Sequence, residues 1–370
     1  MRKTLLALCA SILAFGSMYA VPAKPGKPLT FTQSDGTTIQ VSMVGDEFRH
    51  SFVTTDGITV AQAENGDFYY RTPAGISDRL AHNATDRSAS EASWIASQAE
   101  ALSISATPNK ARKRAAAQKS PQVPGTGSPK IPILLVQYTD KKMSNTKEDF
   151  ETIYSKSAKS AKQYFVDQSR GKFSPQFDLY GIYTLSSNRA TYGGNDYNGN
   201  DECDVVIVVY AGVGEAQAYG IVPNAVWPCQ WQLSDAKIYG DGPGKLTLDG
   251  VGIDKFAVFN ETRGSRDSGT QLDGIGTFCH EFSHCLGLPD FYDTEYSGAY
   301  FGMGNWSLLD GGCYNDDGDT PCGYTAYEKE FMGWMKISTP EPNTQYSLDP
   351  ITNADAVAYK VVNDKDKDEY

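Results

Sequence analysis

The sequence predicts an α+β catalytic domain preceded by a small β-rich unit. Two nearly continuous apolar runs, residues 131–138 and 204–211, are typical of strands buried on both faces. A helical pattern over residues 146–168 lies between them. Alternating polar and apolar residues over 30–71, broken by Asp-Gly and Asn-Gly turns, predict a meander of antiparallel strands. A chain of 370 residues has room for two or three such units.

The charge of the chain excludes some classes of function. The formal net charge is -12, which argues against a general nucleic-acid binder. Residues 1–130 carry a net +4 and residues 131–370 a net -16, which suggests two units with different tasks. After the first residues no run of about 18 apolar residues occurs, so we expect no membrane span and no nucleic-acid partner.

The first twenty residues have the pattern of a secretory signal peptide. Arg2 and Lys3 form its charged start, and a short apolar core follows over 5–15. Small residues then allow cleavage after Ala20 or Ala23. We therefore expect a secreted protein, or one at the cell surface if a further C-terminal region anchors it.

The residues that carry chemistry lie in one short segment with the pattern HExxH. His280 and His284 are four residues apart, so on a helix they share a face and can bind one metal ion together. Glu281 then lies beside that metal, where it can take a proton from a bound water. The pattern predicts a catalytic zinc site with Glu281 as the general base.

A catalytic zinc site needs a third protein ligand. The other histidines of the chain, His50 and His82, both precede the basic region around residue 112, so cleavage there would leave a carboxylate, a thiolate or a tyrosine as the third ligand. Gly287 and Pro289 end the helix and turn the chain, and that turn can bring Asp290 back to the metal. The alternatives are carboxylates farther along the chain: Asp293, Glu295, Glu328 and Glu330.

The stretch HEFSHCLGLPDFYD, residues 280–293, resembles the immune-inhibitor-A-like metalloproteases, peptidase family M6, a metzincin-like group. Four other segments are similar to the same family, namely residues 208–215, 226–231, 305–311 and 321–328.

The resemblance implies a zinc-dependent endopeptidase that is secreted and made as a zymogen, with protein or peptide substrates. It implies a metzincin-like catalytic domain with a twisted mixed sheet and an active-site helix. The expected segments are a signal peptide (1–20), a β-rich propeptide (21–106), a basic cleavable linker (107–130), the catalytic domain (131–338) and the start of a truncated C-terminal β region (339–370). An activating protease is expected to cut the linker at 110–114, which reads KARKR.

Two departures from the family pattern matter. The family usually has a Met in a turn beneath the zinc, where this chain has Leu309. The loop 195–204 is rich in Asp and Asn but lacks EF-hand spacing, so a calcium ion there is a weaker expectation than a solvated loop.

Two roles have more than one candidate residue: blocking of the zinc in the zymogen, and stabilisation of the oxyanion. The propeptide could block the zinc with Asp46, Glu47 or His50, or cover the cleft without ligating it. Tyr314 or Tyr324 could donate a hydrogen bond to the oxyanion that forms during hydrolysis.

The cysteines that follow the signal peptide predict one disulfide. Six cysteines follow the signal peptide, and Cys313 and Cys322, which flank a polar loop, form the expected disulfide.

One alternative function is an inactive binding protein on a protease scaffold, which Leu309 favours and the retained Glu281 opposes. Another is a zinc enzyme that acts on a non-peptide amide.

Overall fold

The computed structural model describes residues 21–46, 49–106, 123–186, 188, 205–218, 222, 225–238, 244–248, 251–264, 269–296, 301–353, 355–362 and 365. The expected signal peptide, the cleavage region 110–114 and the loop 195–204 therefore lie outside the described residues, as do Glu47 and Cys203.

The first unit is an antiparallel meander of six strands, which pair in chain order. These strands are β1 (Leu29–Thr32), β2 (Thr38–Gly45), β3 (His50–Thr54), β4 (Thr59–Gln62), β5 (Phe68–Thr72) and β6 (Gly75–Leu80). The helix α2 (Ala89–Ser97) and the short η1 (Ile104–Ala106) follow. Alternation along β2 buries one face, which packs with α2 into a small apolar core of its own.

The second unit is built on a five-stranded mixed sheet in the order β10-β13-β9-β7-β8. Its strands are β7 (Lys130–Gln137), β8 (Gln176–Thr184), β9 (Val206–Val213), β10 (Cys229–Gln232) and β13 (Lys255–Thr262). All pairs are parallel except β10 with β13. Every residue of β9 is buried, as expected for the central strand of a sheet covered on both faces.

The predicted helix over 146–168 is divided. The structure has α3 (Lys147–Glu151), which continues into the π-helical η3 (Thr152–Lys156), and then α4 (Ala161–Gln168). The chain turns between them because the Ser160 side chain accepts a hydrogen bond from the Gln163 amide and so caps a new helix. The break lets both pieces pack along one side of the sheet, where Phe150 and Phe165 are fully buried.

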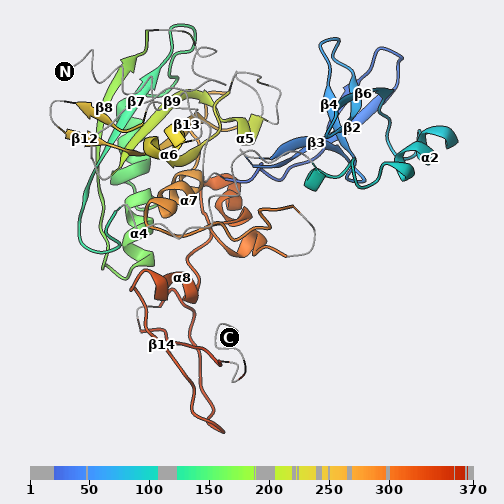
Figure 1. Ribbon diagram of the computed structural model, residues 1–370. Coiled ribbons are helices and arrows are strands. Elements are labelled where there is room, and N and C mark those ends of the chain that lie inside the picture. The colour runs from blue at the N-terminus through green and yellow to red at the C-terminus, as the bar shows by residue number, and fades with distance from the viewer. Residues whose placement is uncertain are drawn as a thin grey trace.

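The helix α7 (Ile275–Cys285) follows the last strand of this sheet, and shorter elements make up the rest of the unit. They are α5 (Glu215–Ala218), α6 (Leu233–Ile238), β11 (Leu246–Leu248), β12 (Val251–Ile253), η5 (Gly304–Trp306), η6 (Gly311–Gly318), α8 (Ala326–Phe331), β14 (Ile337–Ser338) and β15 (Ala358–Tyr359). In Figure 1, α7 lies beneath the five-stranded sheet and beside the orange segments that follow it in the chain, and α8 and β14 project below.

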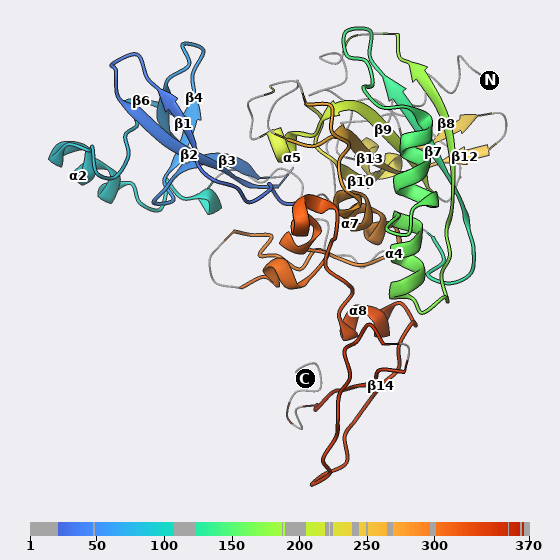
Figure 2. The ribbon, with the colours of Figure 1, turned by 180° about the vertical axis from the view of Figure 1, so that it is seen from behind.

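The two sheets lie apart, and a narrow connection joins them. Figure 1 and the opposite view in Figure 2 both show the six-stranded sheet to one side of the larger body, with β2 and β3 extending toward α7. Met43 of β2 is buried in the core of the larger unit, whereas Val41 belongs to the core of the first unit. The architecture is therefore mixed, with helices and sheets, as predicted. No described helix has both the length and the apolar character that crossing a membrane requires.

Candidate metal centre

Helix α7 carries the HExxH pattern, and all of its residues are buried. It packs against β10, β13, α4 and η6. Close approach to η6 requires Gly276, since a Cβ there would lie 1.8 Å from the Cys313 carbonyl oxygen. Packing against these four elements therefore fixes the position of the motif helix without a bound ligand.

A glycine turn ends α7 and redirects the chain. The Leu288 amide donates to the Ser283 carbonyl and the Gly287 amide to the His284 carbonyl, with Gly287 at φ +99°. This is a Schellman turn, which favours glycine at the left-handed position. It reverses the direction of the chain, so that Asp290 returns toward the helix.

Three side chains converge at this turn. The ligand-type atoms of His280, His284 and Asp290 all lie within 4.8 Å of one another. The Nε2 atom of each imidazole is 3.3 Å from Asp290 Oδ1. Ligands at about 2.0–2.1 Å from a tetrahedral zinc ion are about 3.3–3.4 Å apart, so the two distances from Asp290 fit that metal.

The hydrogen bonds of the two histidines set their tautomers. His280 Nδ1 lies 2.7 Å from the Leu308 carbonyl oxygen, and His284 Nδ1 lies 2.8 Å from that of Leu288. A carbonyl only accepts, so each Nδ1 carries the proton and each Nε2 presents a lone pair. Both lone pairs face the Asp290 carboxylate oxygen, which is also an acceptor.

The electrostatics of the cluster agree with this assignment. Burial lowers the pKa of His280 and so favours its neutral form. Three acceptor atoms that face one another in a buried site are compatible with a cation between them, and a His₂Asp set suits zinc.

The alternative third ligands lie elsewhere. Glu328 closes a capping box with Thr325 at the start of α8 and accepts from the Ser307 hydroxyl at 3.3 Å. Glu330 pairs with Lys360 at 3.2 Å. Asp293 Oδ1 accepts from the Glu295 amide at 3.2 Å, and the Glu295 side chain reaches toward Arg49. In the described part of the chain, only Asp290 joins the two histidines.

A turn after η5 supports the site from below. The Leu308 carbonyl holds His280, as above, and the Leu309 amide donates to the Ser307 hydroxyl at 3.1 Å. Leu309 is fully buried and belongs to the main core. The position at which the family usually has Met is thus occupied by another apolar side chain within the core.

Glu281 is fully buried and meets the N-terminal segment of the described chain. The Val21 amide nitrogen donates to Glu281 Oε1 at 2.6 Å. The indole Nε1 of Trp227 donates to the Val21 carbonyl at 3.0 Å. A segment more than 250 residues away in sequence therefore lies directly against the predicted general base.

The structure separates the two candidate tyrosines. The Tyr314 hydroxyl donates to the Pro22 carbonyl at 2.7 Å, so it faces the segment that lies against Glu281. The Tyr324 hydroxyl hydrogen-bonds the Ser283 hydroxyl behind α7, and its side chain is buried in the core. Tyr314 is the one that meets a peptide carbonyl near Glu281.

The β2–β3 connection, where blocking residues are expected, contacts the wall of the site. Asp46 accepts from the hydroxyls of Tyr292 and Tyr296, at 3.3 and 3.4 Å. The His50 ring stacks on Trp227 with 4.9 Å between centroids. In the described residues it is Val21 that reaches Glu281, a contact that no local sequence pattern indicates.

The expected disulfide is wrong. The thiols of Cys313 and Cys322 are both free in the structure, as are those of Cys279 and Cys285. Cys313 is buried in the core beneath α7, whereas Cys322 is only partly buried and lies outside that core. The polar loop between them therefore does not bring the two sulfur atoms together.

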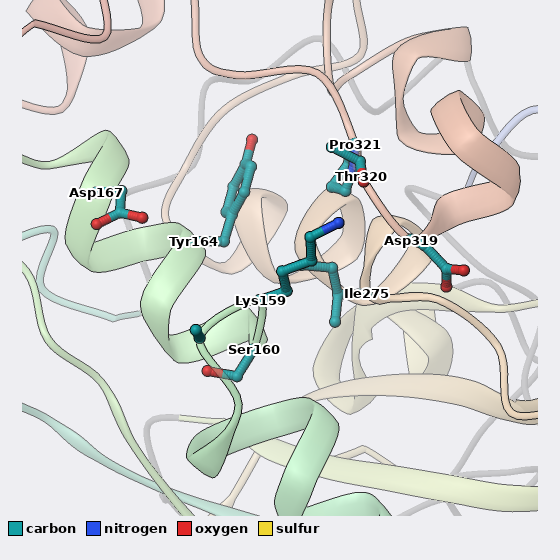
Figure 3. A pocket seen from close by; sticks show the side chains of 9 residues that line it. Lys159, Ser160, Tyr164, Asp167, Ile275, Asp319, Thr320 and Pro321 are labelled. Atoms are coloured by element: carbon teal, nitrogen blue, oxygen red, sulfur yellow. The ribbon is translucent and has the colours of Figure 1, made fainter.

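A small pocket of about 180 Å³ lies beside α4 and the start of α7 (Figure 3). Lys159, Tyr164, Ile275 and Asp319 are among its lining residues. The three converging side chains and Glu281 are not part of its lining, so this pocket is separate from the predicted metal site.

Comparison with known proteins finds similarity in the segment that contains the predicted metal site. Residues 201–336 match the family model of the immune inhibitor A peptidase M6 catalytic domain. This segment of the chain is therefore similar to a metalloprotease catalytic domain. Among relatives, the chain is 28% identical over 166 residues to "Immune inhibitor A" of Bacillus thuringiensis subsp. alesti, which covers 42% of this chain and 22% of that protein.

The chain is also similar to a protease from another organism. The chain is 26% identical over 221 residues to "Pre-pro-metalloprotease PrtV" of Vibrio cholerae serotype O1, which covers 47% of this chain and 23% of that protein. The chain thus spans less than a quarter of the length of these relatives. The matched segment contains both histidines, Glu281 and Asp290.

Proposed function

We propose that the chain is a secreted zinc endopeptidase made as a zymogen, with His280, His284 and Asp290 as zinc ligands and Glu281 as the general base. The observation that carries the proposal is the tautomer-fixed pair of Nε2 lone pairs, each 3.3 Å from Asp290 Oδ1. The M6-like domain supports the same reaction class. The metzincin-like architecture and the propeptide role of residues 21–106 belong to this proposal.

In the proposed mechanism the zinc ion and the side chains of the protein have separate roles. Zinc, when bound, polarises the scissile carbonyl and makes water acidic enough to act near neutral pH. Glu281 accepts a proton from the attacking water at its carboxylate and returns it to the leaving amine. The buried setting of Glu281 favours this proton transfer, because few water molecules compete for its carboxylate. Tyr314 orients the peptide backbone through its hydroxyl.

Latency follows from the segment that lies against Glu281. Signal cleavage after Ala20 would make Val21 the first residue, and its new amino group would face the carboxylate that must act as base. Cleavage after Ala23 would remove this contact, so the proposal requires the earlier site. The segment also fills the place in which a substrate backbone would meet Trp227 and Tyr314.

The test uses the purified full chain before and after limited trypsin digestion. We expect one zinc per chain by elemental analysis, casein hydrolysis only after cleavage near residues 110–114, loss with a chelator and recovery with zinc. Glu281→Ala should keep the zinc and lose hydrolysis by about 10²–10⁴-fold. A wild-type protein that binds zinc but is as inactive as Glu281→Ala on varied peptides would instead support the binding-protein alternative.

A further inference from the structure

Lys24 follows Val21 by three residues in the sequence. Its position is fixed by contacts with residues 201–336, the M6-like part of the chain. Its amide donates to the Ala216 carbonyl at 2.9 Å, which sets the backbone. Its ammonium group pairs with Asp317 Oδ1 and lies 5.7 Å from the centroid of the Tyr314 ring. The Lys24 side chain is only 15% exposed, unusual for a lysine in a surface ion pair.

The loop that receives this ammonium group is acidic and built in a fixed shape. Asp316 and Asp317 both have left-handed backbone angles, φ +52° and +59°. Arg263 bonds the Asp319 carboxylate and lies 3.7 Å from Asp317 Oδ2. Three carboxylates and one guanidinium leave the loop with a net charge of about -2, which Lys24 offsets in part. The Lys24 ammonium holds the pKa of Asp317 below its ordinary value.

Most contacts that hold residues 21–24 come from beyond residue 130. Glu281, Trp227 and Tyr314 bind the first two residues, and Ala216 and Asp317 bind the fourth. The exception is the Ala23 amide, which donates to the Gly45 carbonyl at 2.7 Å. Removal of the propeptide would therefore leave these partners in place for a substrate.

We propose that Asp317 and the face of the Tyr314 ring form a substrate subsite for a Lys or Arg side chain, three residues after the residue whose nitrogen faces Glu281. The inference rests on the proposed endopeptidase function and names the substrates that it favours. In extended chain the subsite lies about 10 Å from the scissile bond. The segment 21–24 then occupies the cleft in the manner of a cleavage product, and Lys24 occupies this subsite.

The first test measures specificity with the trypsin-activated protein. Quenched peptides that share the sequence Val-Pro-Ala-X after the scissile bond, with X as Lys, Arg, Gln or Glu, are compared by kcat/KM. One partly exposed ion pair with a cation–π contact predicts a preference of about three- to ten-fold for Lys or Arg over Gln. Raised salt should reduce this preference.

Two matched variants assign the preference to one carboxylate. Asp317→Asn should abolish the discrimination between Lys and Gln, because cleavage of the Lys peptide falls toward that of the Gln peptide. Asp316→Asn removes the same charge from the neighbouring residue and should keep most of the discrimination; asparagine tolerates the left-handed backbone at both positions. Equal cleavage of the Lys and Gln peptides by the wild type, or equal losses in the two variants, would overturn the proposal.

The second test does not depend on catalysis and uses the uncleaved full chain. Hydrogen exchange of the segment 21–29 should quicken about three- to ten-fold in Lys24→Gln and in Asp317→Asn, and the double variant should exchange no faster than either. Additive effects, or no change in either single variant, would refute the contact. If the activated wild type cleaves no peptide, the proposed function and the subsite fail together, and this measurement decides separately whether Asp317 holds Lys24.

Discussion

Replacing Tyr314 with Phe distinguishes two roles for its hydroxyl. In the structure that hydroxyl donates to the Pro22 carbonyl, one residue beyond the residue whose nitrogen faces Glu281. A carbonyl at this place in a bound substrate lies beyond the scissile bond. We therefore expect the hydroxyl to bind the substrate backbone, and not the oxyanion for which Tyr314 and Tyr324 were both candidates.

The two roles predict effects of different size. Loss of one neutral hydrogen bond costs about 0.5–1.5 kcal/mol, which is about a 2- to 13-fold loss in kcat/KM. Loss of an oxyanion donor would slow the chemical step by about 10²–10³-fold. We expect Tyr314→Phe to show the smaller loss, mainly as a higher KM, because the bond is made to substrate and transition state alike.

The assay is steady-state hydrolysis of one quenched peptide by the activated wild type and by Tyr314→Phe, with zinc content measured in both. Tyr324→Phe is the matched control, since its hydroxyl bonds Ser283 behind α7. It should leave KM unchanged. If Tyr314→Phe instead slows turnover by about 100-fold or more at an unchanged KM, the backbone-binding role is refuted and the oxyanion role is restored.

Four further variants test the metal site, its helix and a buried charge. Asp290→Ala should weaken zinc binding by at least about 100-fold in chelator competition, whereas Glu328→Gln should lose stability by about 1 kcal/mol and keep its zinc; the reverse pattern would make Glu328 the ligand. Gly276→Ala should cost about 3 kcal/mol or more, because its Cβ would lie 1.8 Å from the Cys313 oxygen; an unchanged denaturation midpoint would contradict this close approach. Burial lowers the pKa of Lys329 from 10.5 to about 8, so between those values the native state binds fewer protons than the unfolded state and its stability rises with pH. Relative to Lys329→Met, the wild type should therefore gain about 3 kcal/mol from pH 8 to 10.5 in chemical denaturation, and parallel pH profiles would exclude the shift.

The strands and the motif helix are readable from the sequence because their signals are local. The apolar run at 131–138 and the run at 204–211 correspond to β7 and β9, since a strand buried on both faces needs continuous apolar residues. The long helical pattern predicts one helix where the structure has a break, because the cap made by Ser160 outweighs the periodicity on either side.

The site itself is only partly readable. Spacing alone places His280 and His284 on one helical face with Glu281 beside them, since a helix repeats every 3.6 residues. A glycine turn can be anticipated from Gly287, and with it the return of Asp290. The pairing of the cysteines cannot be anticipated, because nearness of two cysteines in the sequence does not set the direction of their side chains.

The sequence by itself determined that His280, Glu281 and His284 lie together on one helix, and its first twenty residues predict secretion. The tertiary structure decided which carboxylate joins the histidines, which tyrosine meets a peptide carbonyl and which segment lies against Glu281. These are contacts between residues up to about 290 positions apart, with Val21 against Glu281 and Lys24 against Asp317. No local pattern encodes such contacts, because they depend on how the tertiary fold brings residues 21–24 against Glu281 and Asp317.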